Sequence, residues 1–418
     1  MRNLARSIVL LLALGLSEPV LAGQLEDADA AYYKQDYATA LRLFRPLADQ
    51  GNARAQTRLG LMYANGNGVP LDYVEAVKLY RLAADQGDAG AQSNLGVMYE
   101  FGQGVPKDYV QAAKWYRMAA DQGYARAQSR LGLMYENGHG VPQDYVEAVK
   151  WYRLAADQGY AVAQTNLGVM YRKGQGVPQD YVQAAKWFQL AADQRIALNA
   201  RARNTLGVMY ELGQGVPQDY VQAVKWYRLA ADQRDAGAQS NLGVMYDKGH
   251  GVPQDYAQAV KWFRLAADQG DARAQANLGV MYANGHGVPQ DYVQAVKWYR
   301  LAADRGDAVA QYNLGVMYAN GHGVPQDYAQ AVKWYRLAAD QSYAGAHYNL
   351  GVMYNLGQGV PEDYVEAHKW FNLSASRASA DEKYVHDLAV KNRDRVAGLM
   401  TPAQIAEAQK RASAWQPK

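Results

Sequence analysis

The chain has 418 residues, a formal net charge of +3 and 49% hydrophobic residues. It contains no cysteine, which excludes disulfides, thiolate nucleophiles and thiolate metal ligands. So small a net charge creates no bulk basic field, so neither nucleic acid nor an anionic membrane surface is expected as a partner.

The first 22 residues have the features of a cleavable export signal. Arg2 and Arg6 precede an apolar run from Ile8 to Leu16, and small residues around Ala22 suit a cleavage site. The run is shorter than the ~20 residues that cross a bilayer, and no later run comes close to that length. The sequence therefore predicts a periplasmic or secreted protein that is cut after Ala22 and has no membrane span.

Residues 23–52 predict a pair of helices that caps the amino-terminal end of the fold. Tyr37, Ala40, Leu41 and Phe44 have the spacing of one apolar helix face. The same spacing returns in the second half of every unit that follows, so we interpret 23–52 as a variant of those units.

Residues 53–379 form a tandem repeat. Proline follows Gly-Val nine times, in steps of 36 residues except for one step of 39. These prolines lie at positions 70, 106, 142, 178, 217, 253, 289, 325 and 361. A period of this length is typical of repeat proteins in which each unit is one small structural element.

The unit 272–307 shows what each repeat builds. Ala274, Leu278 and Met281 recur at helical spacing and predict a first helix that stops before Gly285. Asp291 is then placed to cap a second helix, which we expect to end near residue 306. One such pair cannot bury both of its faces, so neighbouring pairs must stack into a solenoid.

The segment GHGVPQDY, as at 285–292, joins the two helices. We expect Gly285, Gly287 and Pro289 to end the first helix and turn the chain, and Gly279 to leave room for the aromatic pair of the second helix. A phosphate-binding loop is the alternative for a glycine-rich segment, but such loops follow a strand rather than a helix.

The recurring pattern A-x-x-x-L-G-x-M-Y-x-x-G-x-G-V-P-x-D-Y-x-x-A-x-K-W-Y-x-x-A-A-D resembles the Sel-1-like repeat family, a relative of the tetratricopeptide repeats. Its Gly-Val-Pro loop distinguishes it from ordinary tetratricopeptide units, whose period is about 34 residues. The resemblance implies an all-α fold: a right-handed α/α superhelical solenoid of nine 36-residue helix-turn-helix repeats with terminal caps. It also implies an adaptor or scaffold function, often in exported bacterial proteins.

Two departures from the repeat remain. Three extra residues near 195–200 account for the longer step, and they are either a hinge, a recognition element or a neutral insertion. Residues 380–418 lose the repeat but keep helical periodicity, and we interpret them as carboxy-terminal capping helices. Thr401, Pro402 and Gln404 predict a capping box that opens a final helix running to about Ala412.

The sequence shows no sign of catalysis or of a bound cofactor. No nucleophile elbow, phosphate-binding loop or zinc-protease motif occurs, and a chain that repeats like groups along a line is poorly suited to bring unlike groups to one point. His139, His250, His286 and His322 share one loop position. Zinc ligands lie ~2.1 Å from the metal, whereas packed helices are ~8 to 10 Å apart, so we expect solvent-facing polar residues rather than a metal site.

The candidate binding site is the open face of the first helices. With each unit numbered from its first alanine, positions 3, 7, 8, 10 and 11 share the packed side, and positions 2, 5, 6, 9, 12 and 13 share the other. In tetratricopeptide relatives that second face lines a concave, peptide-binding groove. Position 6 is asparagine in six units: Asn94, Asn166, Asn241, Asn277, Asn313 and Asn349.

An asparagine amide both donates and accepts hydrogen bonds, so stacked copies can bind the backbone of an extended peptide. The alternatives are solvent-facing filler and bonds to a neighbouring repeat. Four arginines make the early units basic on this face: Arg54, Arg58, Arg126 and Arg130. Tyr312 and Tyr348 replace small residues at position 5 near the other end. We therefore predict a protein or peptide partner, with no enzyme activity.

A second hypothesis is that the face binds a cell-wall fragment or another small molecule, with β-lactam hydrolase activity as its extreme form. Saccharide binding needs aromatic side chains that face the groove, and Tyr312 and Tyr348 are the regular candidates. The chain lacks the cysteines of the relatives associated with β-lactams and has no Ser-x-x-Lys motif.

Overall fold

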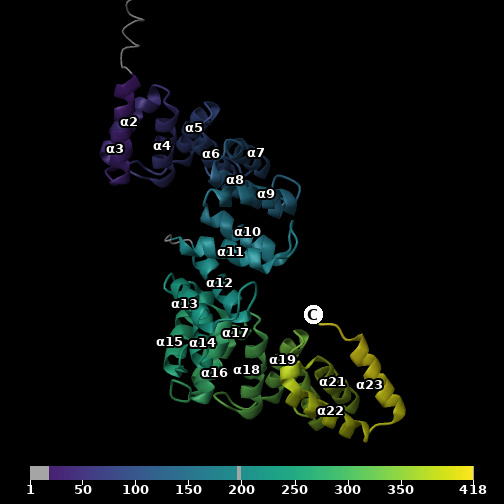
Figure 1. Ribbon diagram of the computed structural model, residues 1–418. Helices are drawn as coiled ribbons and strands as arrows, with labels where there is room; N and C mark the ends of the chain where they lie inside the picture. Colours follow the sequence, from purple (N-terminus) through teal and green to yellow (C-terminus); the bar gives the residue numbers. More distant parts are fainter. Residues whose placement is uncertain (1–17, 195–198, 418) are drawn as a thin grey trace, which may run out of the picture. The chain divides into compact units, whose positions relative to one another are not determined.

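The computed structural model describes residues 18–194 and 199–417. Most of the predicted export signal and the centre of the insertion, residues 195–198, lie outside these ranges. Within them the chain is entirely helical, as predicted, with no strand (Figure 1). None of the described helices combines the length and apolar character needed to cross a membrane.

Every predicted repeat forms a helix pair. The first helices are α4 (Ala53–Asn65), α6 (Ala89–Phe101), α8 (Ala125–Asn137), α10 (Ala161–Lys173), α12 (Ala200–Leu212), α14 (Ala236–Lys248), α16 (Ala272–Asn284), α18 (Ala308–Asn320) and α20 (Ala344–Leu356). The second helices are α5 (Tyr73–Asp85), α7 (Tyr109–Asp121), α9 (Tyr145–Asp157), α11 (Tyr181–Asp193), α13 (Tyr220–Ala231), α15 (Tyr256–Asp268), α17 (Tyr292–Ala303), α19 (Tyr328–Asp340) and α21 (Tyr364–Arg377).

Two further helix pairs lie at the ends. They are α2 (Glu18–Tyr33) with α3 (Tyr37–Asp49), and α22 (Lys383–Ala397) with α23 (Pro402–Ala414). The chain divides into two compact units: residues 1–202 with 214–216, and residues 203–213 with 217–418. Within each unit the helices of successive repeats pack against one another in chain order, which is the stacking expected of a solenoid, whereas the last helix, α23, packs against α21 rather than α22 (Figure 1).

Local sequence sets the ends of the helices. Asp271 accepts a hydrogen bond from the backbone N–H of Ala274 at 2.7 Å and begins α16, and Gly285 ends it with a left-handed φ of 71°. Asp291 accepts from the N–H of Gln294 at 3.0 Å and begins α17. Both helices of the unit 272–307 therefore begin as predicted and the first also ends as predicted, whereas the second ends at Ala303, three residues before the predicted position.

The core lies between the two helices of each repeat and continues into the next repeat. In the unit 272–307, Ala274 and Leu278 of α16 and Tyr299 of α17 are buried. A Cβ atom on Gly279 would lie 2.6 Å from the Tyr299 ring, so only glycine lets this ring reach the helix. This confirms the predicted close approach. Full burial of a side chain of this size contributes about 2 kcal/mol, repeated in every unit.

The glycine-rich loop does more than turn the chain. Gly287 has a φ of 69°, and a Cβ atom there would overlap the carbonyl group of Tyr256, the first residue of helix α15 in the preceding repeat. The equivalent glycines of the other loops meet the equivalent tyrosine backbone in the same way. The loop is therefore also an inter-repeat contact, which explains why both glycines recur.

The end pairs cover the terminal repeats. In the amino-terminal pair Ala28, Ala40 and Phe44 are fully buried against the first repeat. At the other end, Thr401 and Gln404 form the predicted capping box, and α23 packs against α21.

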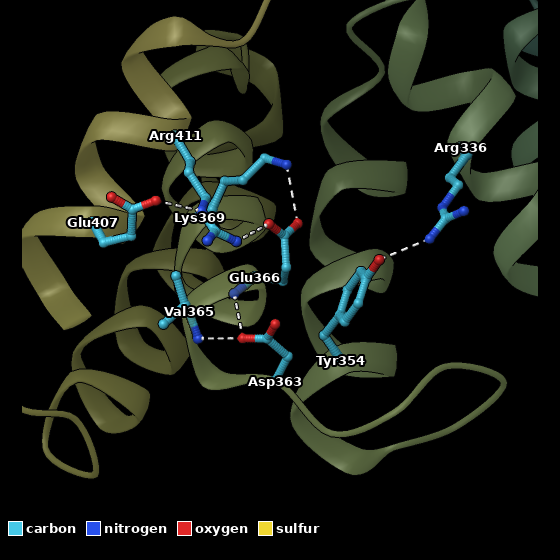
Figure 2. A network of polar contacts seen from close by, with 8 residues as sticks. All are labelled: Arg336, Tyr354, Asp363, Val365, Glu366, Lys369, Glu407 and Arg411. Carbon is cyan, nitrogen blue, oxygen red and sulfur yellow. Dashed lines mark hydrogen bonds and ion pairs between the residues drawn. The ribbon is translucent and has the colours of Figure 1, made fainter.

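A polar network reinforces that second contact (Figure 2). Glu366 of α21 lies 3.0 Å from Lys369 Nζ and 2.9 Å from Arg411 of α23, and Arg411 also pairs with Glu407 at 2.8 Å. Glu366 is half-buried, and its two cationic neighbours keep the pKa of its carboxyl low despite that burial.

Candidate functional site

We call the surface made by positions 2, 5, 6 and 9 of the first helices, together with the residue that precedes each helix, the first-helix face. In the first unit, the compact unit of residues 1–202 with 214–216, two adjoining hollows lie on this face. The first hollow, about 330 Å³, has Arg58, Asn94 and Arg126 in its walls. The second, about 550 Å³, has Arg126, Arg130 and Asn166. Because Arg126 lines both, the hollows adjoin, and their walls together extend from α4 to α10. The structure thus brings four of the predicted site residues together: Arg58, Asn94, Arg130 and Asn166.

The arginines of this face differ in how far they are already paired. Asp29 of α2 lies 2.5 Å from Arg54 and 2.8 Å from Arg58. Arg130 lies 3.4 Å from Glu100. Arg126 is exposed and forms no ion pair with another residue in the described ranges. Its guanidinium group is therefore available to a ligand.

Glu100 shows how the face connects to the core. It is buried and accepts a hydrogen bond of 2.5 Å from the hydroxyl of Tyr116, which is fully buried on α7. Burial raises the pKa of Tyr116, and the adjacent Glu100 raises it further, so the phenol stays protonated and donates. The resulting chain of contacts from Tyr116 through Glu100 to Arg130 fixes Arg130 in place.

The six asparagines at position 6 are all half-buried, but they do not form one uniform row. Asn241 donates to Asn204 Oδ1 at 2.9 Å and accepts from Arg273, so its amide is used inside the protein. Asn166 lies beside the Tyr152 hydroxyl, and Asn349 beside the hydroxyls of Tyr312 and Tyr335.

The other three asparagines of the row are Asn94, Asn277 and Asn313. Their side chains form no hydrogen bond with any residue that the structure describes. The alternative that asparagines at position 6 form hydrogen bonds to a neighbouring repeat thus holds for Asn241. The side-chain amides of Asn94, Asn277 and Asn313 remain free.

The Tyr312 and Tyr348 side chains pack against other aromatic rings and do not present an open ring face to the groove. The Tyr312 ring lies 5.0 Å from the Tyr343 ring and 6.0 Å from the Tyr335 ring. The Tyr348 ring lies 5.7 Å from the Phe371 ring, and its hydroxyl accepts a hydrogen bond from Asn392. The helical wheel had placed position 5 on the open face, but this position faces the neighbouring first helix and is buried in five repeats: Ser93, Ser129, Thr165, Ser240 and Ala276.

The four loop histidines stack on aromatic rings. His286 lies over Tyr256 of the preceding repeat with 4.5 Å between ring centroids, and His139, His250 and His322 contact Tyr109, Tyr220 and Tyr292 in the same way. The sequence predicted solvent-facing polar residues at this position. The structure differs in that each ring also contacts a tyrosine of the preceding repeat. Among the described residues no cluster of three or more His, Asp or Glu could hold a metal ion.

The family model described as Sel1 repeat matches ten stretches of the chain: 28–52, 53–88, 89–124, 125–160, 161–195, 200–235, 236–271, 272–307, 308–343 and 344–379. The chain belongs to the Sel1 repeat family. Nine of these Sel1 repeats are the units found from the sequence pattern, and the shorter match at 28–52 falls on the variant pair at the amino-terminal end. Sel1 repeat proteins are generally protein–protein interaction scaffolds and are typically not enzymes.

Solved structures of other Sel1 repeat proteins support this assignment. A protective antigen of uropathogenic Escherichia coli strains with an SLR fold is 35% identical, with 94% of this chain and 91% of that chain covered and a TM-score of 0.50. A Sel1 repeat protein from Oxalobacter formigenes is 36% identical, with 75% and 90% covered and a TM-score of 0.55. A comparison with curated proteins gave no match.

A buried row of glutamines joins one Sel1 repeat to the next, and the sequence interpretation missed it. Gln128, which is 4% exposed, donates to the carbonyl of Ala120 at 3.2 Å and accepts from Gln158 of the following second helix at 2.8 Å. The same first bond is made by Gln56, Gln92, Gln164, Gln239, Gln275 and Gln311. The sequence signal was the glutamine that recurs at position 4, an unusual residue for a packed face.

A second row of inter-repeat bonds uses the arginines of the second helices. Arg336 of α19 donates to the Tyr354 hydroxyl of α20 at 2.7 Å (Figure 2). Equivalent bonds run from Arg81, Arg264 and Arg300 to the tyrosine 18 residues later. These bonds give the arginines of the second helices a stacking function.

The last Sel1 repeat has histidine in place of the buried glutamine. His347 is fully buried, and its ring stacks on Trp370 at 5.6 Å and meets Trp415 edge-on at 5.2 Å. It lies beside the Ala339 carbonyl, and neither ring nitrogen forms a hydrogen bond of normal geometry with a described residue. Burial, reinforced by the nearby charge of Arg377, lowers the pKa of His347 to about 4.

Proposed function

We propose that this Sel1 repeat protein is an exported scaffold that binds extended segments of partner proteins on its first-helix face. The observation that carries the proposal is the pair of adjoining hollows whose walls together extend from α4 to α10. Asn94 provides a free amide there and Arg126 a free guanidinium, and both groups suit a peptide backbone or its side chains. Such a groove spans several repeats, so a partner can be held by many weak contacts along its length.

The alternative of a cell-wall or other small-molecule ligand receives less support. Saccharide binding requires exposed aromatic faces, and the Tyr312 and Tyr348 rings are covered by neighbouring side chains. The hollows of the first unit have Tyr124 and Tyr160 in their linings, but four arginines and two asparagines line them as well, and these favour a charged or amide-bearing ligand.

Binding to the first-helix face can be tested with the double variant Asn94→Ala/Asn166→Ala. A partner is first captured from an envelope extract with the wild-type protein, and its affinity for both proteins is then measured. Two lost hydrogen bonds should weaken binding about tenfold, at 0.5 to 1.5 kcal/mol each. Gln111→Ala is the matched control, because Gln111 lies on a second helix and its side chain forms no hydrogen bond with a described residue.

A photo-crosslinking residue placed at Leu61, in the wall of the first hollow, should also attach to the partner. Unchanged affinity of the double variant, together with crosslinks only from second-helix positions, would refute the assignment of the binding face.

Export is the second part of the proposal. It rests on the basic residues and apolar run at the amino terminus, and the similar E. coli protein being a protective antigen supports it. Replacing apolar residues between Ile8 and Leu16 with charged ones should leave the protein uncleaved in the cytoplasm, as judged by fractionation and mass spectrometry. A wild-type protein found in the cytoplasm with Met1 intact would contradict export.

A further inference from the structure

The first unit has an alternating arrangement of arginines that no other part of the described chain shares. Arg54 and Arg58 lie one turn apart on α4, and Arg126 and Arg130 lie one turn apart on α8. The intervening helix α6 has Gly90 and Asn94 at the same two positions. Since Gly90 has no side chain, the first hollow stays open between the two arginine pairs.

The walls of the hollows carry far more positive than negative charge. Four arginines line them, against one carboxylate, Asp88. Asp88 is occupied, because it accepts from the N–H of Ala91 at 2.6 Å and from the Thr57 hydroxyl at 3.2 Å, at the positive end of the α6 dipole.

The nearby carboxylates outside the linings are also held. Asp29 is shared by two arginines, so it cannot neutralise both. Glu100 pairs with Arg130, and Glu136 accepts a hydrogen bond from Tyr152. Arg126 remains without a carboxylate partner in the described ranges, in the wall shared by both hollows.

The residues that precede the first helices provide an independent observation. In four repeats an aspartate stands there and caps the helix: Asp88, Asp235, Asp271 and Asp307. At α8, α10 and α20 the position is Tyr124, Tyr160 and Tyr343, which make no capping hydrogen bond. Loss of such a cap costs about 1 kcal/mol. Tyr124 and Tyr160 line the hollows, so at two of these three helices the missing cap also leaves the groove without an aspartate charge.

From these observations we propose that the first-helix face of the first unit binds an acidic segment of a partner protein in extended form. Glutamate or aspartate carboxylates of the segment pair with Arg126 and with the arginine pairs on either side of α6, while Asn94 bonds its backbone. Tyr124 and Tyr160 provide aromatic surface at the rim. This inference rests on the proposed function and specifies the chemistry of the partner.

The test uses the full-length protein and labelled peptides of about ten residues, which extend over roughly 33 Å. One peptide alternates Glu with Ser, and a second has Gln in place of every Glu. Fluorescence anisotropy at low salt should show the Glu peptide binding at least tenfold more tightly, with the difference shrinking as salt rises. Arg126→Gln should weaken binding of the Glu peptide about tenfold, as expected for loss of a charge-assisted hydrogen bond.

Two controls separate charge from geometry. Lys114→Gln removes the same charge from an exposed position on α7, outside both hollows, and should leave affinity unchanged. Arg126→Lys keeps the charge but loses the planar fork, so its affinity should fall between those of the wild type and Arg126→Gln. Because Arg126 is exposed and forms no ion pair with a described residue, neither Arg126→Gln nor Arg126→Lys should change the melting temperature.

Equal binding of the Glu and Gln peptides, or an Arg126→Gln protein that binds the Glu peptide like the wild type, would overturn the acidic assignment. The proposed scaffold function would survive either result if the Asn94→Ala/Asn166→Ala variant bound the captured partner more weakly than the wild type did. A sulfated oligosaccharide that binds more tightly than the Glu peptide, with the same dependence on Arg126, would show that the ligand is a polyanion other than protein.

Discussion

Replacing His347 with glutamine should make the carboxy-terminal repeats less sensitive to acid. His347 occupies the slot that a buried glutamine fills in seven other repeats. The variant His347→Gln restores that residue and can donate to the carbonyl of Ala339. It also removes a buried imidazole that contacts two tryptophan rings.

The size of the effect follows from the pKa of His347. In the folded protein it is about 4, compared with 6.5 for an exposed histidine. As the pH falls below 6.5 the unfolded chain takes up a proton here that the folded chain does not, so folding becomes less favourable. The free energy of unfolding should drop by about 2 kcal/mol between pH 7 and pH 5 from this residue alone, and by about 3 kcal/mol at pH 4. Below about pH 4 the loss levels off.

Denaturant unfolding of the wild type and His347→Gln at pH 7 and pH 5, followed by circular dichroism, measures this contribution. Loss of ring stacking changes the stability of the variant by the same amount at both pH values, and all other titrating groups are common to the two proteins. The difference between the proteins should therefore shift by about 2 kcal/mol in favour of the variant at pH 5. Parallel pH profiles would refute the reasoning and show that the pKa of His347 in the folded protein is that of an exposed histidine.

Three further comparisons test the contacts between repeats. Gln128→Ala leaves buried hydrogen-bonding groups unpaired and should lower the free energy of unfolding by about 2 kcal/mol, and an unchanged denaturation midpoint would contradict the glutamine row. Gly306→Ala places alanine at a positive φ in open space and should lower the free energy of unfolding by about 1 to 2 kcal/mol. Gly287→Ala adds an overlap with the preceding repeat and should lower it clearly more in the same assay. Equal losses of stability would count against the loop contact. Asn241→Ala should destabilise by about 1 kcal/mol because its amide is bonded, while Asn277→Ala should leave stability unchanged or slightly raised because alanine is the better helix former. Equal thermal shifts for that pair would show that the two amides have the same surroundings.

The helices of this fold were predictable because their signals are local. Asp291 lies three residues from the N–H that it caps, and Gly285 follows directly after the helix that it ends. The packing of Gly279 against Tyr299 was also predictable, because both belong to one repeat and one apolar face. Each of these contacts depends on residues within about twenty positions of one another, where helical periodicity fixes which side chains meet.

The contacts between repeats were not predictable in the same way. Asn241 meets Asn204 of the preceding repeat across 37 residues, and periodicity alone does not say how far one helix pair is rotated against the next. The misplaced position 5 has the same cause. A helical wheel gives the direction of a side chain around its own helix, but the neighbouring first helix decides whether that direction is open or covered. Tyr312 is covered in this way.

The repeat itself separates the residues that hold the fold from those that select a partner. A residue copied into nearly every unit, such as the buried glutamine or the second glycine of the loop, makes the same inter-repeat contact each time, and so it cannot distinguish one stretch of the groove from another. Residues that break the pattern on an open face can. Tyr124 and Tyr160 replace capping aspartates, and Arg126 stands free between them. These departures coincide with the adjoining hollows of the first unit, where a stacking requirement would have kept the common residue. Specificity for a ligand should therefore be sought there, and not in the uniform rows that first draw attention in the sequence.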